Sequence, residues 1–250
     1  MAWLVVAGCV PRLDVPKVER QKPAKIANRA DLAPIQLEAM RFKLRRGTKI
    51  GTCEYMFFAN CYPFIEAVYW NRGRVNASDV EYADLFFEAM TDANFNVVSD
   101  PKKIFKDGSS DVVKPAYLIG GQIEEIRMNV RDHISIWDDR RLGTQSGKGY
   151  VKVKWQVFSL FDCKIVFQAE TTGYADIEEP ATDGEMVILT ESFAEAAANL
   201  ATNEYLVALL SKGAPALTDI RATEDVRLLI PRRAASCSTD RSPRTSTAFG

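Results

Sequence analysis

The sequence predicts an α+β domain, a two-layer sandwich in which helices pack on one face of a mostly antiparallel sheet. Three observations lead to this fold class. Long runs of alternating apolar and polar residues fill 117–177, and two stretches near 78–94 and 182–213 have helical periodicity. Strands and helices also come in groups rather than in strict alternation, which is typical of α+β folds.

The strand pattern is strongest in the second half of the chain. "GYVKVKWQVF" and "KIVFQAETTGYADI" each keep their apolar residues at one parity, and a short hairpin link joins them. In "AYLIGGQIEEIRMNV" the apolar parity changes, which requires an extra residue, so we place a β-bulge near Glu124-Glu125. These three strands should form an antiparallel meander with one solvated face.

Two short apolar runs, "IQLEAMRFKL" and "TKIGTCEYMFF", predict earlier strands joined by a turn at Arg45-Arg46-Gly47. A helix should follow, with Ser78 as N-cap, Glu81 completing a capping box and an end near Asn94. Its expected apolar face consists of Val80, Ala83, Phe87 and Met90. "FNVV" at 95–98 then predicts a short buried strand.

A second helical region completes the domain. Thr182 and Glu185 form a capping box pattern, and the helix should restart after Thr202 and stop at Gly213 and Pro215. The apolar stripe of the first of these helices comprises Met186, Leu189, Phe193, Ala197 and Leu200.

The 250 residues therefore divide into four parts. Residues 1–9 are a lipoprotein-type signal segment, 10–33 a flexible tether, 34–217 the α+β domain, and 218–250 a disordered Ser/Arg-rich tail. The formal net charge of −1 gives no one-signed field, so we expect no nucleic-acid partner.

The membrane signal lies at the N-terminus, where Val6-Ala7-Gly8-Cys9 matches a bacterial lipobox. In such a motif the cysteine receives a diacylglyceryl group, and two acyl chains hold a protein on a membrane. The apolar run before Cys9 is short and no Lys or Arg precedes it, so we expect the true start to lie upstream. The alternative is a cytosolic protein whose first strand happens to contain this sequence. We expect a periplasmic lipoprotein of the outer membrane.

The stretches "YLIGGQIEEIRMNV", "GKGYVKVKWQVFSLFDCKIVFQAETTGYA" and "ESFAEAAANLATNEYLVALLSKG" resemble an alphaproteobacterial periplasmic domain. In relatives this domain precedes a trypsin-like serine protease. The chain also resembles, more distantly, the small α/β domains of the envelope lipoproteins CsgG, LpoB and the N-terminal part of TolB. The resemblance spans about residues 47–213. Too few residues follow it for a catalytic domain, which implies either a stand-alone domain or a chain whose protease half was replaced by a frameshift.

Candidate reactive groups are few. The single histidine, His133, and Ser146 in "GTQSGKG" lack the strand-turn-helix setting of a nucleophile, and we expect a flexible loop at 143–149. Asp132, Asp138 and Asp139 near His133 match no metal-ligand spacing. Glu124 and Glu125 point to opposite faces of a strand, unless the bulge turns one aside, so they are not an acid/base pair. The sequence predicts no catalytic residue, no metal and no cofactor.

Two other groups of residues remain as candidates. Cys53 and Cys61 could form a disulfide only if the chain reverses between them, and buried thiols are the alternative. The aromatic stretch 55–70 either belongs to the core or presents Tyr69 and Trp70 to a partner. From these observations we expect a non-catalytic, lipid-anchored periplasmic domain that binds or regulates an envelope protein or assembly. The alternative is the accessory domain of a periplasmic serine protease that lacks its catalytic half.

Overall fold

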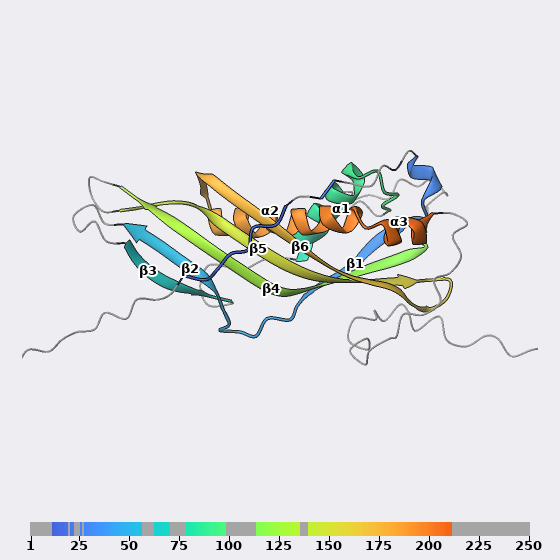
Figure 1. Cartoon of the computed structure of the whole chain (residues 1–250), viewed down its shortest axis with the longest axis horizontal. Helices are drawn as coiled ribbons and strands as arrows, with labels where there is room; N and C mark the ends of the chain where they lie inside the picture. Colours follow the sequence, from blue (N-terminus) through green and yellow to red (C-terminus); the bar gives the residue numbers. More distant parts are fainter. Residues whose placement is uncertain are drawn as a thin grey trace, which may run out of the picture.

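Three long antiparallel strands dominate the computed structural model of the chain. They are β4 (Tyr117–Ile134), β5 (Arg141–Ser159) and β6 (Lys164–Thr182). β5 lies between the other two and forms a hairpin with β6, with Ser159 paired to Lys164. Together they run along the long axis of the molecule (Figure 1). The predicted meander is confirmed.

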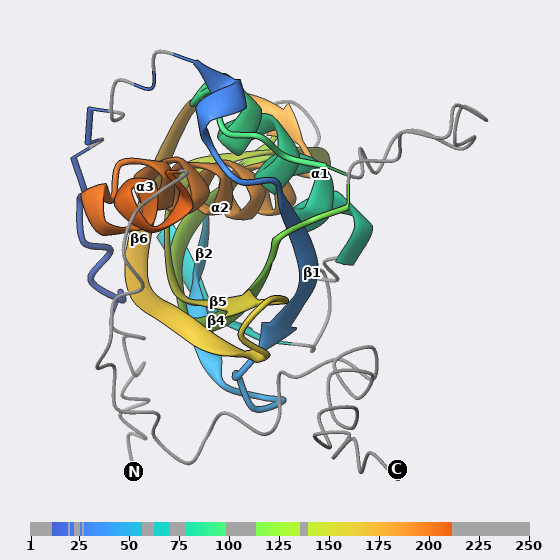
Figure 2. The same cartoon turned by 90° about the vertical axis from the view of Figure 1, so that its right-hand side faces the viewer.

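The structure describes residues 12–19, 21–22, 26, 28–56, 63–70, 79–98, 114–135 and 140–211. Within this part of the chain, six strands form one mixed, mostly antiparallel sheet in the order β3-β2-β4-β5-β6, with β1 also paired to β4. Helices pack on one face of this sheet, which curves beneath them (Figure 2). The α+β fold predicted from the sequence is therefore the observed one.

The predicted β-bulge is present in β4. Ile123 pairs with Val153 of β5, but Glu125 pairs with the very next residue, Lys152, so Glu124 is the extra residue. Ile123 before the bulge and Ile126 after it are both buried, because the insertion restores the inward direction of the apolar side chains. The parity change in the sequence was thus sufficient to locate the irregularity.

The first two strands lie end to end beside β4 and both run parallel to it. β1 (Ile35–Phe42) pairs with 117–123, and β2 (Lys49–Met56) pairs with 128–132. The predicted turn between them is present, with Thr48 N donating a 3.0 Å hydrogen bond to Arg45 O and Gly47 at φ +83°. β3 (Pro63–Tyr69) is antiparallel to β2 and forms one edge of the sheet, a strand that the sequence pattern did not indicate.

The helix α1 (Asp79–Asp92) covers one part of the sheet. As predicted, it ends just before Asn94, which adopts a left-handed φ of +66°. Its fully buried side chains are Tyr82, Phe86 and Met90, whereas Ala83 and Phe87 are half-buried. The predicted face is therefore rotated by about one residue, because the aromatic rings of Tyr82 and Phe86 fill the core. The predicted strand at 95–98 reduces to a single bridge between Val97 and Ile35.

The helices α2 (Gly184–Ala201) and α3 (Glu204–Leu210) complete this layer. Of the predicted stripe, Leu189, Phe193, Ala197 and Leu200 are buried, and Met186 at its start is half-buried. The predicted capping box is wrong, since Thr182 ends β6 and Asp183, at φ +53°, precedes the helix without a side-chain cap. The restart is confirmed, because Asn203 Oδ1 accepts hydrogen bonds from the backbone N–H groups of Tyr205 and Leu206.

Six aromatic side chains connect the sheet to the helices through the core. Phe193 of α2 lies edge-on to Tyr82 at 4.7 Å between ring centroids and 6.0 Å from Trp155 of β5. The neighbouring contacts join Trp155 to Phe86, Tyr82 to Phe42, and Phe42 to Trp70. Such ring pairs add to the burial of apolar surface, so this chain of contacts joins α1 and α2 to β5, to the end of β1 and to Trp70 after β3.

None of the described helices is long and apolar enough to cross a membrane.

Candidate functional site

A segment near the N-terminus crosses the outer face of the sheet, the face turned away from the helices. We call residues 12–22 the strap; residue 20 lies outside the described part of the chain. Asn129 Nδ2 donates a 2.8 Å hydrogen bond to Leu13 O, and Arg127 donates one of 3.3 Å to Asp14 O. Arg12 forms a 2.5 Å ion pair with Glu54 of β2. The start of the strap is therefore bound to both β2 and β4.

The far end of the strap is bound as well. Gln21 N donates a 3.2 Å hydrogen bond to Asn199 Oδ1 of α2, and Thr202 Oγ1 donates a 2.7 Å bond to Gln21 Oε1. Further along, Asn94 Nδ2 donates a 2.9 Å bond to Ile26 O. The composition of 10–33 predicts a flexible tether, whereas these described residues are hydrogen-bonded to the domain.

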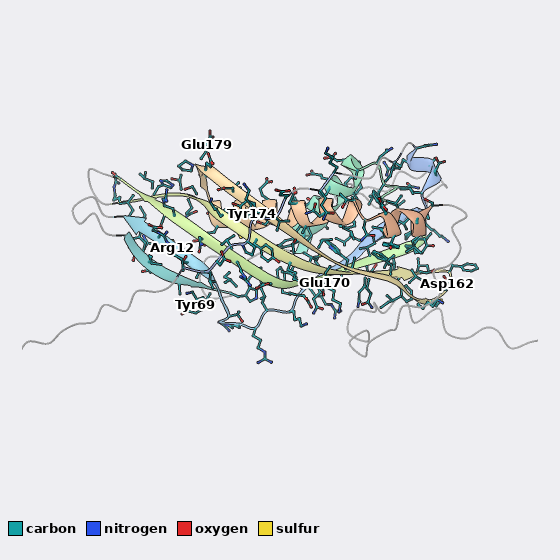
Figure 3. The ribbon with its side chains drawn as sticks, in the orientation of Figure 1. Arg12, Tyr69, Asp162, Glu170, Tyr174 and Glu179 are labelled. Carbon is teal, nitrogen blue, oxygen red and sulfur yellow. The ribbon has the colours of Figure 1, made fainter. Side chains whose placement is uncertain are left out.

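A hollow of about 380 Å³ opens on the outer face beside Arg12. Its polar lining is of mixed charge and includes Glu54, Asn129, Arg131, Ser146, Lys148, Asp176 and Glu178. Much of this charge is paired internally, through Arg12 with Glu54 and through Lys148 with Asp176 at 3.2 Å. Figure 3 shows the labelled Arg12 in front of this part of the sheet, well away from the labelled Asp162.

The structure brings together His133 and Ser146, the two residues that the sequence analysis considered for catalysis and set aside. His133 Nε2 lies 2.9 Å from Ser146 Oγ. The nearest acidic residue in sequence, Asp132, instead lies 3.6 Å from Arg141 Nε and lines a different hollow, of about 390 Å³, together with Glu185. A serine-protease triad needs its carboxylate to orient the histidine beside the serine. Here the serine and this carboxylate open onto separate hollows.

The predicted loop at 143–149 is wrong, because these residues belong to β5. The glycines that suggested a loop instead allow close packing. A Cβ atom on Gly149 would lie 2.3 Å from Ile188 Cγ2 of α2, and one on Gly147 would lie 2.2 Å from Asn129 O. Ser146 therefore lies within a strand, opposite Arg131 of β4, at a point where the pairing of β5 with β6 is irregular.

Within the described ranges, no three His, Cys, Asp or Glu side chains gather in a way that could hold a metal ion. Asp138 and Asp139, weighed above as ligands, lie outside those ranges.

A set of ion pairs covers the outer face from β4 to β6. Lys152 lies 2.7 Å from Glu170, and Lys43 lies 3.0 Å from Glu124. The hydrogen bond from Lys152 lowers the pKa of Glu170, and the same bond raises the pKa of Lys152. Burial, together with a hydrogen bond to Asp176, raises the pKa of Tyr174 on the same face. These pairs bring opposite charges together across the described part of this face.

The predicted site residues fall in different places. Cys9 and Cys61 lie outside the described residues, and Cys53 is buried on β2 at 7% exposure. Trp70 is 4% exposed and packs against Phe42, whereas its neighbour Tyr69 is 37% exposed. Of the two aromatic residues considered for a partner surface, only Tyr69 therefore reaches solvent.

Among the described residues, the most exposed aromatic side chains lie at the end of the molecule away from Arg12. Phe161, at the tip of the β5–β6 hairpin, is 91% exposed, and Tyr205 of α3 is 69% exposed. The hairpin and α3 lie at the same end of the long axis (Figure 1). Sequence reasoning missed these residues, although a large apolar residue in the hairpin turn "SLFDCK" was an available signal.

The chain resembles solved structures in fold, but no protein family matches its sequence. No family model matches the chain, and no curated protein matches it. Among solved structures it resembles protein XCC0632 from Xanthomonas campestris, described under the family model DUF330, with 10% identity and a TM-score of 0.36. That match covers 79% of this chain and 94% of the other.

The chain also resembles the hypothetical protein CT253 from Chlamydia trachomatis, with 6% identity and a TM-score of 0.37. This match covers 68% of this chain and 96% of the other. Neither description mentions a serine protease or an activity.

Proposed function

We propose that this chain is a non-catalytic, lipid-anchored periplasmic domain that binds or regulates another protein or assembly of the cell envelope. Cys9 is the anchor, and the sheet and helices are the scaffold. The observation that carries the binding role is the pair of exposed aromatics, Phe161 and Tyr205, at the end of the molecule away from Arg12. Aromatic residues are enriched in protein interfaces, where the contact excludes water from around them.

The anchor is supported by the lipobox Val6-Ala7-Gly8-Cys9. It is tested by growing cells that express the full chain with radiolabelled palmitate. Label should enter the wild-type protein and be lost in Cys9→Ala. Unlabelled wild-type protein, recovered in the soluble fraction, would contradict the anchor.

The binding role is supported by the way the described reactive groups are arranged. His133 and Ser146 touch each other, but the carboxylate of Asp132 lines another hollow with Arg141. The outer face is covered by internal ion pairs instead of converging acid and base groups. This arrangement suits recognition better than bond breaking.

The binding role is tested with a double variant, Phe161→Ala/Tyr205→Ala, purified from detergent-solubilised membranes beside the wild type. One envelope protein should co-purify with the wild type in constant ratio and be lost from the double variant. Tyr69→Ala, an exposed aromatic elsewhere on the surface, is the matched control and should retain the partner. Equal recovery by all three proteins would show that this end of the molecule does not bind it.

A further inference from the structure

The strap places the lipid anchor at one end of the molecule. Arg12 is held by Glu54, Leu13 O by Asn129, and Asp14 O by Arg127. Two of these three contacts use backbone carbonyls of the strap, so they hold its path independently of the side chains at 13 and 14. An N-terminal segment that is bound to the sheet in this way cannot act as a long flexible linker.

Covalent geometry then limits the distance between the anchor and the sheet. Only three peptide units separate Cys9 from Arg12, so their Cα atoms lie at most about 11 Å apart, whatever path the chain takes. An acylated Cys9 sits at the membrane surface. The hollow lined by Arg12, Ser146 and Lys148 is therefore held close to the lipid headgroups.

The length of β5 sets where the hairpin tip lies. Lys148 lines the hollow near Arg12, and the same strand continues to Ser159, just before Phe161. At about 3.3 Å per residue, the tip is roughly 40 Å from the hollow. Figure 3 agrees with this separation, because the labelled Arg12 and Asp162 lie toward opposite ends of the long axis.

From these relationships we infer that the strap orients the domain on the membrane, with the end of the sheet that carries Arg12 next to the lipid surface and the β5–β6 hairpin pointing away from it. Phe161 is then presented to partners well beyond the headgroup layer. This inference rests on the proposed lipid anchor at Cys9. The strap thereby shortens the free chain between the anchor and the sheet to the residues before Arg12, which limits how far the domain can turn.

The test uses the full, lipidated chain in phospholipid vesicles that carry a fluorescent acceptor lipid. A donor dye is attached by amber suppression at one of two positions, Phe161→p-azidophenylalanine or Glu178→p-azidophenylalanine. Glu178 is exposed and lines the hollow, so its donor should lose much of its lifetime to the acceptor lipids. The donor at 161 should keep nearly its full lifetime.

Two variants remove the orientation without removing the anchor. One inserts about 20 Gly and Ser residues between Cys9 and the strap, a flexible linker with an r.m.s. end-to-end distance of roughly 25 Å. The other, Arg12→Ala/Asn129→Ala, removes two of the contacts that hold the strap. Both should still float with the vesicles, and in both the difference in donor lifetime between positions 161 and 178 should shrink.

The outcomes separate the two claims. If the wild-type chain fails to float with vesicles, the lipid anchor is wrong and the orientation fails with it. If the chain floats and the donors at 161 and 178 lose equal lifetime, the anchor stands and the orientation is overturned. Variants that keep the full wild-type difference would show that the strap is not the orienting element.

Discussion

Trp155 and Ala196 are joined through one buried hydroxyl group. Trp155 Nε1 donates a 2.7 Å hydrogen bond to Thr171 Oγ1, and this hydroxyl donates a 2.7 Å bond to Ala196 O. The bond therefore connects β5, β6 and α2 at a point where the aromatic core meets the helix layer. Each of the three groups is buried, so their mutual bonds replace contacts with water.

We expect Thr171→Val to destabilise the fold by about 1–3 kcal/mol, because the buried indole N–H of Trp155 would lose its acceptor. Valine has nearly the same shape, so little of the effect would come from a cavity. Thr171→Ser keeps the hydroxyl and should cost less than Thr171→Val. Urea unfolding of the three proteins measures the difference, and equal losses for Val and Ser would refute the role of the hydroxyl.

Trp70→Ala should destabilise the fold much more than Tyr69→Ala does. Trp70 is buried against Phe42 with ring centroids 4.6 Å apart, so its removal should cost about 3–5 kcal/mol of folding free energy. Tyr69, at 37% exposure, should cost much less. Thermal melts monitored by circular dichroism provide the comparison. A stable, folded Trp70→Ala protein would place Trp70 outside the core.

The Lys152–Glu170 pair should make a small contribution to stability that depends on pH. The pKa of Glu170 is lowered from its ordinary value of 4.5, so the contribution is present above that pH and is lost as pH falls through the lower, folded-state pKa. The pKa of Lys152 is raised from 10.5, so the contribution is also lost at more alkaline pH.

We expect Glu170→Gln to lower stability by ~0.2–1 kcal/mol near neutral pH, a modest value because solvent screens the half-exposed pair. The gap to the wild type should close in strongly acidic buffer and in about 1 M salt. Melting temperatures across a pH series measure it. A gap that stays constant from neutral to acidic pH would rule out the ion pair as its cause.

Ser146 should not act as a nucleophile, even though its hydroxyl oxygen lies 2.9 Å from His133 Nε2. A fluorophosphonate probe, which reacts with activated serines, should leave the purified protein unlabelled. Ser146→Ala should anchor in membranes and bind its partner like the wild type. Labelling of the wild type that disappears in Ser146→Ala would overturn the non-catalytic assignment.

The sequence was informative where a pattern depends on neighbouring residues along the chain. The parity change around Glu124 located the bulge, and Asn94 and Asn203 marked where helices end and begin. These features depend on the local direction of side chains and on local backbone hydrogen bonds. They need no knowledge of what lies across the fold.

What the sequence missed depends on contacts between distant segments. The strap is held by two of its backbone carbonyls and by polar side chains of a kind that loose tethers also contain, so its composition does not distinguish it from one. The 2.9 Å approach of His133 to Ser146 follows from the pairing of β4 with β5. Gly147 and Gly149 suggested a loop, because the sequence does not distinguish a glycine that is needed for close packing from one that is needed for a turn.

The end-to-end arrangement of β1 and β2 divides the sheet into two panels. β1 pairs with β4 up to Ile123, and β2 pairs with it from Met128 onward. In the described part of the chain, the stretch between them pairs as a strand with β5 alone and contains the extra residue Glu124. This stretch of β4, between the two panels, is the place where the long sheet bends most easily. Because a β-bulge bends its strand and increases the local twist, the two panels can twist by different amounts on either side of Glu124.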